Sequence, residues 1–355
     1  MSLELIRIRC LRNISEAEIS PHPCINLIIG KNGSGKTSLL EGIYLLGRGR
    51  SFRSRRLETL IQRGSDSLDV FGIATYREGT CRIGLRKTGK GTEVHINGEK
   101  VLKLSKLVKT TAVHVITPNS HELLERGSEL RRRFLEWGVF HVEPAYRQAA
   151  HRYHRALSQR NAALKKDHTL VSSWNAELVE WGEKLNGFRE SYFLALRERF
   201  LLEASVFFDT GDLDLVWKRG WPPGRELPDI LKDNQINDIK QGFTRYWPHR
   251  ADLSVRKGGD TVSQRTSRGE QKLAVICLVL AQTEAILRHS GNRPVLLIDD
   301  LNAELDQENR IKMMSRCRNS DYQVFITATG WKLPAEHSAD KVFHVEHGVI
   351  TETGV

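Results

Sequence analysis

The sequence predicts an α/β fold in which the two ends of the chain build one sheet and a helical region is inserted between them. Three features indicate it. An apolar run, Ile25–Ile29, leads into a glycine-rich loop and a helix, and a second run, Val295–Ile298, ends in two aspartates. Between them, residues 126–202 have the apolar spacing of long amphipathic helices. A chain of 355 residues can hold two compact units, or one large α/β domain with an insertion.

Charge and cysteine content narrow the class of protein. Lysine and arginine number 54 against 43 aspartates and glutamates, giving a net charge of +11, which favours a polyanionic partner. The alternative is that basic charge simply coats a soluble surface. Five cysteines are scattered singly, without a C-x-x-C pair, and the chain start lacks a signal-peptide pattern. We expect a cytoplasmic protein that neither crosses a membrane nor is secreted.

The loop after the first apolar run has the pattern G-x-x-x-x-G-K-T, from Gly30 to Thr37. Its glycines allow positive φ and let consecutive N–H groups converge on an anion at the start of a helix. Lys36 is expected to contact the β- and γ-phosphates, and the Thr37 hydroxyl to bind Mg²⁺. A plain Gly/Ser-rich turn is the alternative. The strand-loop-helix context favours a nucleoside triphosphate site.

An arginine-rich segment follows the helix predicted over residues 36–46. Five arginines, interleaved with serine and phenylalanine, lie between positions 48 and 56. Such a run is typical of a solvated loop. Because it comes just after the nucleotide site, contact with a phosphate backbone is the second interpretation.

Residues 68–104 change to the alternating pattern of antiparallel strands. Val70, Ile73 and Thr75 are assigned to one side of the first strand, and Asn97-Gly98 marks a hairpin turn. Residues 112–116 form a buried strand that ends at Pro118.

The helical region is expected to run to about residue 202, with a break near Asp167-His168-Thr169. Apolar residues in its second half repeat every three or four positions, and a matching stripe lies in the first half. Two helices sharing one seam predict an antiparallel hairpin about 30–40 Å long. Its aromatic residues indicate packing rather than a platform for bases. Residues 126–166 carry ten basic against three acidic side chains.

The second apolar run ends at Asp299 and Asp300. If this strand lies parallel to the strand before the glycine loop, Asp299 reaches the metal and Asp300 faces the space beyond the γ-phosphate. A solvated strand end is the alternative. Upstream, Ser267 begins a long apolar helix with Glu270 as a capping-box partner, and such a helix start is also an anion site. Further strands are expected at residues 324–327 and 342–345.

These segments together resemble the ATPase head of the ATP-binding-cassette family, through Ser267-Arg268-Gly269-Glu270-Gln271 and Asn302-Ala303-Glu304-Leu305-Asp306. The helical insertion between the two halves is similar to the SMC/Rad50 branch. Within that branch the chain resembles the RecF-type recombination mediators from residue 3 to about residue 348. The motifs that carry this closer resemblance are Leu11-Arg12-Asn13, Leu40-Glu41-Gly42-Ile43-Tyr44, Gly49-Arg50-Ser51-Phe52-Arg53, Arg131-Arg132-Arg133-Phe134-Leu135 and Gln159-Arg160-Asn161.

The resemblance implies an ATP-dependent switch. Magnesium is expected at Thr37 and Asp299, and catalytic roles at Asp300 and Lys36. In an ATP-dependent homodimer, Ser267, Gly269 and Gln271 of one subunit would close over the nucleotide of the other. Proteins of this type hydrolyse ATP slowly, bind duplex DNA and single-strand/double-strand junctions, and assist recombinase loading with RecR-like and RecO-like partners. The implied ATP-binding residues are Gly30, Lys31, Asn32, Gly33, Ser34, Gly35, Lys36, Thr37 and Ser38.

Three positions depart from the cassette pattern. The last buried strand has Thr327 and Thr329 but no histidine where transporter cassettes sense the γ-phosphate, so we expect a threonine hydroxyl to substitute. Asn119 follows Pro118 where RecF-type chains have glutamate. Ala303 replaces a serine of the dimer contact.

The resulting prediction is an ATPase head with an antiparallel β subdomain and an inserted helical arm. The N-terminal half of the head is assigned to residues 1–118, the arm to residues 119–250 and the C-terminal half of the head to residues 251–355. Two other functions remain open, a cassette ATPase that does not bind DNA and an SMC-like structural head. The arginines predicted to contact DNA are Arg50, Arg53, Arg132 and Arg133.

Overall fold

The computed structural model describes residues 2–76, 79–208, 213–291, 293–330 and 339–353. Contacts divide the chain into two compact units. Unit 1 consists of Met1–Ser120 and Ile286–Val355, and unit 2 of His121–Ala285. The two ends of the chain therefore do build one unit, with a second unit inserted between them.

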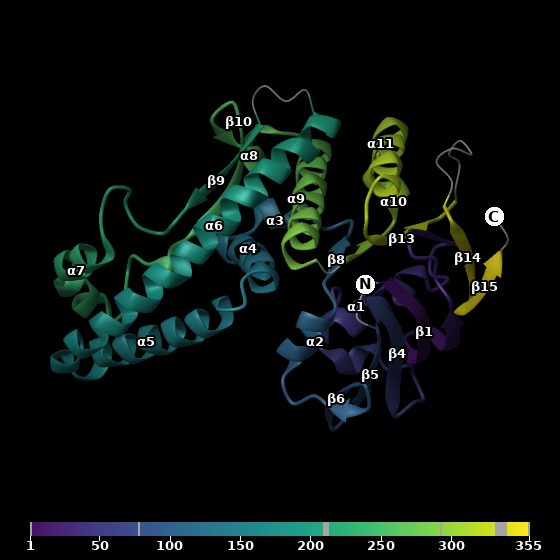
Figure 1. Ribbon diagram of the computed structural model, residues 1–355, viewed down its shortest axis with the longest axis horizontal. Helices are drawn as coiled ribbons and strands as arrows, with labels where there is room; N and C mark the ends of the chain where they lie inside the picture. The colour runs from purple at the N-terminus through teal and green to yellow at the C-terminus, as the bar shows by residue number, and fades with distance from the viewer. Residues whose placement is uncertain (1, 77–78, 209–212, 292, 331–338, 354–355) are drawn as a thin grey trace. The chain divides into compact units, whose positions relative to one another are not determined.

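The central sheet of unit 1 has the strand order β15-β14-β3-β13-β12-β8 (Figure 1). All its strands are parallel except β15, which pairs antiparallel with β14. Parallel strands are buried on both faces, which explains why β12 and β13 are continuously buried. The strands are β3 (Ile25–Ile29), β8 (Val113–Ile116), β12 (Val295–Ile298), β13 (Gln323–Ala328), β14 (Lys341–Glu346) and β15 (Val349–Thr353).

A second, antiparallel sheet of unit 1 has the order β2-β1-β4-β5-β6-β7. Its hairpin turn at Asn97 and Gly98 has positive φ at both residues, as predicted. The expected phase of β4 was wrong, because every second residue from Leu68 to Ala74 is buried and Ile73 and Thr75 are on the other face. The strands are β1 (Ser2–Leu11), β2 (Ile14–Ile19), β4 (Ser67–Tyr76), β5 (Gly79–Thr88), β6 (Gly91–Ile96) and β7 (Glu99–Lys100).

Helix α1 (Lys36–Arg48) packs against strands of both sheets, and its apolar side chains belong to one core with theirs. This packing fixes the start of α1 at the carboxyl end of β3. The other helical segments that lie wholly in unit 1 are η1 (Leu57–Leu60), α2 (Leu104–Thr110), α10 (Leu301–Glu304) and α11 (Gln307–Arg318).

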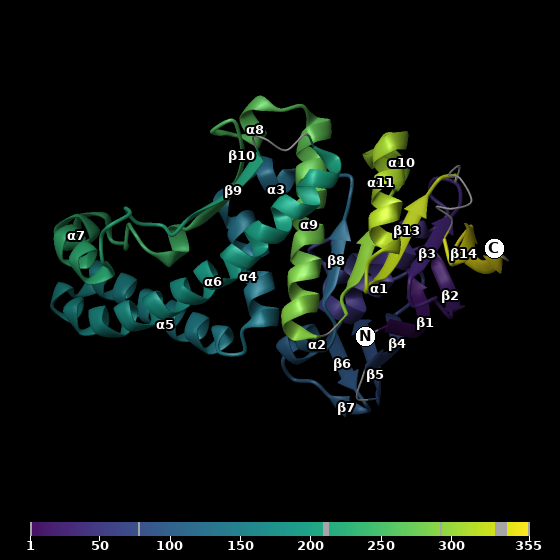
Figure 2. The ribbon, with the colours of Figure 1, turned by 45° about the horizontal axis from the view of Figure 1, so that its top comes forward.

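Unit 2 contains the predicted helical hairpin, formed by α5 and α6, which lie antiparallel and pack on each other (Figures 1 and 2). The break between them falls where it was expected, and the Asp167 side chain accepts the Thr169 N–H there. A second break separates α4 from α5 at Pro144. The helices are α3 (Glu122–Glu125), α4 (Ser128–Val142), α5 (Tyr146–Lys166), η2 (His168–Leu170), η3 (Ser172–Trp174), α6 (Asn175–Phe207), α7 (Leu227–Gln241), η5 (Pro248–Arg250), α8 (Val262–Arg265) and α9 (Arg268–Ser290), of which the part from Ile286 on belongs to unit 1.

A three-stranded sheet of unit 2, β11-β10-β9, was not expected from the sequence. Its strands are β9 (Leu213–Lys218), β10 (Asp252–Lys257) and β11 (Asp260–Thr261). Because β10 pairs with β9 and also packs on α4, residues 251–285 group with the arm rather than with the ATPase head to which the sequence analysis assigned them.

Among the described residues, α9 is the one helix long and apolar enough to cross a membrane. Of its most apolar stretch, 67% is buried inside the protein. The core helix of a soluble protein has these same properties, and the buried positions of α9 include the polar Gln282 and Thr283.

Candidate nucleotide-binding site

The loop between β3 and α1 has the backbone that a phosphate cradle needs. Gly33 and Gly35 have φ of 78° and 124°, values that residues with a Cβ rarely adopt. Gly30 is required for a different reason, since a Cβ there would lie 2.3 Å from the Val345 carbonyl oxygen in β14. The first-turn N–H groups of α1 have no intrahelical acceptors, so they are available to an anion. The buried Ser34 hydroxyl has no hydrogen-bond partner, which also fits a loop that takes a ligand.

Lys36 is folded back onto its own loop. Its ammonium group donates to the carbonyl oxygens of Gly30 at 2.7 Å and Lys31 at 2.9 Å. Burial lowers the pKa of Lys36, and the nearby carboxylates of Asp300 and Asp299 oppose that shift only in part. A phosphate bound in the loop would give this buried ammonium group a negatively charged partner.

Asp299 lies at the carboxyl end of β12, next to the loop. Its Oδ1 accepts hydrogen bonds from the hydroxyls of Thr37 and Thr327, both at 2.9 Å. Burial raises the pKa of Asp299, and these two hydroxyls lower it in part. A carboxylate and a threonine hydroxyl in contact are the hard oxygen donors that Mg²⁺ prefers, so both predicted metal ligands fit the ion.

Asp300 has a left-handed backbone, with φ of 55° and ψ of 60°. Its N–H donates to the Thr327 hydroxyl at 2.8 Å, which helps to hold this conformation. A left-handed conformation costs a residue other than glycine about 1 kcal/mol, and such outliers collect at functional sites. Of the two threonines proposed to replace the missing histidine, Thr327 is buried in this network, whereas Thr329 is exposed.

These groups surround one cleft of 240 Å³. The volume is below the roughly 300–1,000 Å³ of pockets that enclose a whole small molecule, which suits the phosphates rather than a complete nucleotide. The cleft is lined by Asn13, Asn32, Gly33, Gly35, Lys36, Thr37, Ser38, Arg53, Asp299, Asp300 and Thr327.

Asn13 is a cleft residue to which the sequence analysis gave no role. Its Nδ2 donates to the carbonyl oxygens of Gly33 and Ser34 at 3.3 and 3.0 Å, and its Oδ1 accepts from Ser38 at 2.9 Å. It therefore links the middle of the loop and the first turn of α1 to the turn after β1. The motif Leu11-Arg12-Asn13 could have indicated this role, but the sequence analysis used it only as part of the family resemblance.

Arg53 was predicted to contact DNA, and the structure places it in the wall of the nucleotide cleft. Its charge lowers the pKa of Asp299. The backbone N–H of Arg53 donates to the Ser51 hydroxyl, which in turn bonds the buried carboxylate of Glu41. Arg12 pairs with the same carboxylate, with Nη2 to Oε1 at 3.0 Å. These bonds hold the arginine-rich segment against α1.

The other predicted DNA-contact arginines have different surroundings. Arg132 donates to the Ser128 hydroxyl and the Ala251 carbonyl oxygen, and burial lowers its pKa. Arg133 is exposed and pairs with Glu129 at 2.5 Å, while Arg50 is exposed in unit 1. Their contacts with DNA stay a prediction.

The segment before α9, in unit 2, has the predicted capping box. The Ser267 N–H donates to the Glu270 carboxylate at 3.1 Å, and the Glu270 N–H donates back to the Ser267 hydroxyl at 3.3 Å. The Lys257 ammonium bonds Glu270 at 2.8 Å, and this bond contributes most to the lowered pKa of that carboxyl. Gln271 is buried, and its Oε1 has no hydrogen-bond partner. The Ala303 side chain, the third departure from the cassette pattern, lies outside the described part of the chain.

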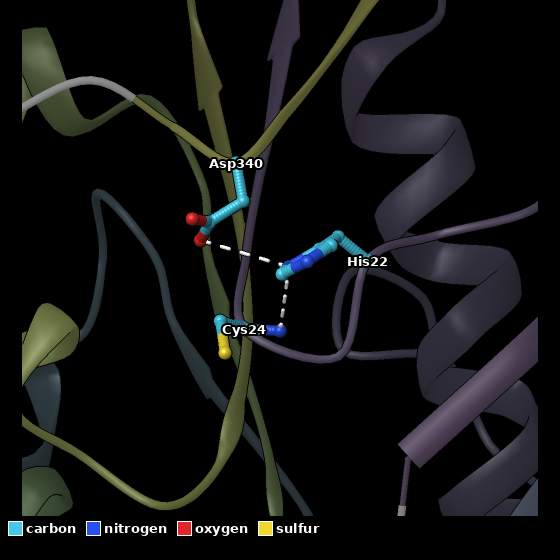
Figure 3. A group of neighbouring side chains, drawn as sticks. All are labelled: His22, Cys24 and Asp340. Atoms are coloured by element: carbon cyan, nitrogen blue, oxygen red, sulfur yellow. Dashed lines mark hydrogen bonds and ion pairs between the residues drawn. The ribbon is translucent and has the colours of Figure 1, made fainter.

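A second cluster of unit 1, formed by His22, Cys24 and Asp340, is explained by its hydrogen bonds (Figure 3). The His22 Nδ1 already accepts the Cys24 N–H at 3.2 Å. Asp340 accepts the Ile25 N–H at 2.9 Å and pairs with Arg318. The cluster therefore links the segment before β3 to the segment before β14, with its histidine and carboxylate lone pairs in use.

The comparisons with known proteins agree with this fold. Residues 2–351 match the family described as RecF/RecN/SMC N terminal domain. The chain is 37% identical to the "DNA replication and repair protein RecF" of Pseudomonas paraeruginosa, covering 99% of this chain and 98% of that one. It is also 37% identical to the protein of the same name from Shewanella baltica, covering 99% of each chain.

Two solved structures show the same fold. "Structure of the recombination mediator protein RecF-ATP in RecFOR pathway" superposes with a TM-score of 0.86 at 24% identity, over 99% of this chain and 98% of that one. A Smc head domain from Pyrococcus furiosus superposes with a TM-score of 0.61 at 16% identity, over 100% and 96%. The predicted α/β fold and the predicted resemblance are confirmed. The chain belongs to the RecF family, within the RecF/RecN/SMC N-terminal domain family.

Proposed function

We propose that this chain is an ATPase that uses slow ATP hydrolysis to switch its binding to DNA during repair and recombination. The cleft of unit 1 carries this proposal, because it gathers a glycine loop, a buried lysine and two strand-end carboxylates around a space of phosphate size. The relatives that cover the whole chain are named for DNA replication and repair, which supports DNA as the partner.

The residues of the cleft have separable roles in this proposal. The loop from Gly30 to Ser38 binds the phosphates, and Lys36 moves from its own carbonyl oxygens to them. Thr37 and Asp299 would hold Mg²⁺, which neutralises charge that develops on the phosphates. Asp300, which lines the cleft next to the metal ligand, orients and deprotonates the attacking water.

The segment that begins α9 supports the proposal of an ATP-dependent homodimer. A Cβ added at Gly269 would meet nothing within 4 Å except the Ser267 hydroxyl at 3.8 Å, so packing within the chain does not require a glycine there. A glycine in a helix costs about 1 kcal/mol relative to alanine, and close approach of a ligand is one reason to keep it. We infer that Ser267, Gly269 and Gln271 close over the ATP held by the second subunit.

DNA binding draws on the net charge of +11 and on the family. We propose duplex DNA and single-strand/double-strand junctions as ligands, and RecR-like and RecO-like proteins as partners in loading a recombinase at gaps. We propose that the protein is soluble and cytoplasmic, because its proposed ligand is chromosomal DNA, and that α9 is a core helix.

The test is binding to a gapped duplex by fluorescence anisotropy with ATP, a slowly hydrolysed ATP analogue, ADP or no nucleotide. Affinity should rise at least tenfold with ATP or the analogue, and should fall steeply between 50 and 200 mM salt as phosphate contacts release counterions, by about 10³-fold or more if six phosphates are contacted. Equal affinity without nucleotide would contradict the switch and leave a nucleotide-binding protein of another function.

Two variants separate the steps. Lys36→Arg should keep dimerisation and lose hydrolysis, because the charge survives while the geometry of the ammonium does not. Ser267→Arg should abolish the dimer while each subunit still binds ATP. Ser158→Arg, which adds the same side chain at an exposed position of α5, is the matched control. Dimers are measured by light scattering and hydrolysis by phosphate release.

A further inference from the structure

Unit 2 has a groove of 1250 Å³ that the ATPase cycle does not use. Its walls are the loop after β9 and the loop from α7 to β10. The two loops are joined where the Trp247 N–H donates to the Gly220 carbonyl oxygen at 3.2 Å. Gly220 has φ of 99°, and a Cβ there would lie 2.3 Å from the Trp247 carbonyl oxygen, so only glycine allows this contact. The groove is therefore a built feature of the fold.

Aromatic side chains line this groove. Trp217, Trp221, Phe243 and Tyr246 all contribute to it, and Phe243 is 38% exposed although it is a large apolar residue. Trp221 is only 9% exposed, yet its indole N–H has no hydrogen-bond partner, and the indole N–H of Trp217 is also buried without one. A buried donor without an acceptor costs about 1–3 kcal/mol, so these two tryptophans occupy their places in the groove wall at some cost in stability.

Positive charge accompanies these rings. Three guanidinium groups lie over aromatic rings: Arg219 over Trp221 at 4.9 Å, Arg245 over Tyr246 at 5.3 Å and Arg250 over Phe243 at 5.8 Å. Arg245 and Arg250 are exposed, as is Lys218 at the end of β9.

The acidic residues of the lining do not cancel this charge. They are Glu190 and Asp252, and Asp252 is already neutralised by two hydrogen bonds from Arg131 at 2.8 and 3.0 Å. The groove is therefore cationic as well as aromatic, which is the combination that binds single-stranded nucleic acid.

A duplex does not fit this chemistry, because its bases are stacked on one another and do not expose their faces to protein rings. A small anion does not need four aromatic residues. The volume also exceeds the roughly 1,000 Å³ at the upper end of small-molecule pockets, which favours a segment of a polymer.

We propose that this groove binds a short segment of single-stranded DNA, with unpaired bases stacked on its aromatic rings and phosphates on Lys218, Arg245 and Arg250. This inference rests on the proposed DNA function and deepens it, since it names the unpaired strand of a gap as the ligand of unit 2.

The experiment measures binding of the full-length protein to a fluorescent 20-nucleotide oligodeoxythymidine by anisotropy. A double variant, Arg245→Glu with Arg250→Glu, should weaken this binding at least tenfold. The control, Arg147→Glu with Arg155→Glu, makes the same change of charge at two exposed positions of α5 and should change the affinity less than threefold. Equal losses in both variants would show that general surface charge binds the strand, and would overturn the inference.

Stacking is tested separately. Phe243→Ala should weaken oligonucleotide binding about fivefold or more, since base stacking on an aromatic ring is worth roughly 1–3 kcal/mol, and Phe243→Trp should restore it. An oligonucleotide containing 5-iododeoxyuridine should cross-link on irradiation to peptides from residues 213–226 and 242–250. Cross-links confined to other segments would refute the assignment, and circular dichroism confirms that each variant is folded.

Failure of this inference can be told from failure of the proposed function. ATP-dependent binding of plain duplex is measured on the same samples. If the wild type binds duplex with ATP but not the oligonucleotide, the groove assignment is wrong and the DNA switch stands. If it binds the oligonucleotide in the groove but never binds duplex, the switch is wrong and the groove assignment stands.

Discussion

Two sets of buried charged residues in this protein differ in whether they bond partners of opposite charge. In the arm, Arg160 is fully buried between α5 and its neighbours, and its guanidinium donates to Asp238 at 2.8 Å, Thr244 at 2.6 Å and Asn175 at 3.0 Å. Arg189 of α6 is 1% exposed and pairs with Glu136. Each of these cations has a carboxylate partner inside the same unit.

The nucleotide cleft of unit 1 lacks such matching. Lys36 has a lowered pKa and bonds only neutral carbonyl oxygens, while Asp299 has a raised pKa and bonds only neutral hydroxyls. Asp300 adds a left-handed backbone conformation, which is unfavourable for a residue other than glycine. Burial lowers the pKa of Arg160 as it does that of Lys36, but Arg160 has a carboxylate partner that opposes the shift, whereas the hydrogen-bond partners of the cleft charges are neutral. Unmatched charge inside one fold therefore marks the place where a ligand completes the structure.

The largest effect that tests this comparison is expected in the arm. Arg160→Met leaves the buried carboxylate of Asp238 without its partner, which should lower the free energy of unfolding of unit 2 by about 3–5 kcal/mol. Urea unfolding followed by hydrogen exchange in α5 and α6 measures it. Arg155→Met, at an exposed position of the same helix, is the control and should change stability by less than about 0.5 kcal/mol. A small loss in Arg160→Met would mean that the arm is not held together by matched charge.

A pH effect of the next size is expected from His249 in the same unit. Burial, with Arg250 beside it, lowers its pKa to about 4, and its Nδ1 bonds the Tyr153 hydroxyl at 2.8 Å. The unfolded chain takes up a proton near pH 6.5, and the folded chain does not. Stability should therefore be full above pH 6.5 and should fall by as much as about 3 kcal/mol as pH drops towards 4.

The measurement for His249 is thermal unfolding from pH 8 to pH 4.5. His249→Gln, which keeps an acceptor for the tyrosine, should unfold with a shallower pH dependence than the wild type over this range. Parallel curves for the two proteins would show that this histidine is not held neutral by the arm.

The sequence predicted the cleft better than its surroundings, for a physical reason. The glycine loop with Lys36 and the strand end with Asp299 are each a short contiguous motif, so each can be recognised from neighbouring residues alone. The left-handed backbone of Asp300 and the hydrogen bonds of Asn13 depend on which segments meet, and the sequence order does not reveal that. The place of Arg53 in the cleft wall arises from the bonds of Ser51 and Glu41, which the sequence order does not reveal either, and its contact with DNA stays a prediction.

The groove of unit 2 shows most clearly what could not be predicted from the sequence. Trp217 lies in β9, Trp221 in the loop after that strand and Phe243 beyond α7, and no spacing rule links them. The sheet β11-β10-β9 was missed because its strands are short and lie 34 residues apart between Lys218 and Asp252. Helical repeats, by contrast, are local, which is why the α5–α6 hairpin and its break were predicted correctly.

A smaller effect, of opposite sign to that of Arg160→Met, is expected in the cleft. Asp299→Asn removes an ionised group that burial disfavours, while its Oδ1 can still accept from Thr37 and Thr327. The midpoint of thermal unfolding without nucleotide should rise by about 2 °C, roughly what 1 kcal/mol produces in a domain of this size. Magnesium-dependent ATP hydrolysis should be lost. A destabilised variant would show that this carboxylate is structural, like those of the arm.

The smallest effect is expected at Gly269. Here the proposed cost of function to stability comes from a glycine in a helix and not from a buried charge. Gly269→Ala places a methyl group in open space on the first turn of α9, and the lost flexibility of the unfolded chain should stabilise the protein by about 0.5 kcal/mol. Gly187→Ala is the matched control, because Gly187 is an exposed helical glycine of α6 whose added Cβ meets nothing within 4 Å, as that of Gly269 meets only the Ser267 hydroxyl at 3.8 Å. Both variants should unfold slightly later than the wild type. Only Gly269→Ala should weaken ATP-dependent dimerisation in light scattering, because only that glycine is proposed to face a second subunit's nucleotide, and equal dimerisation of both variants would remove the reason for a glycine there.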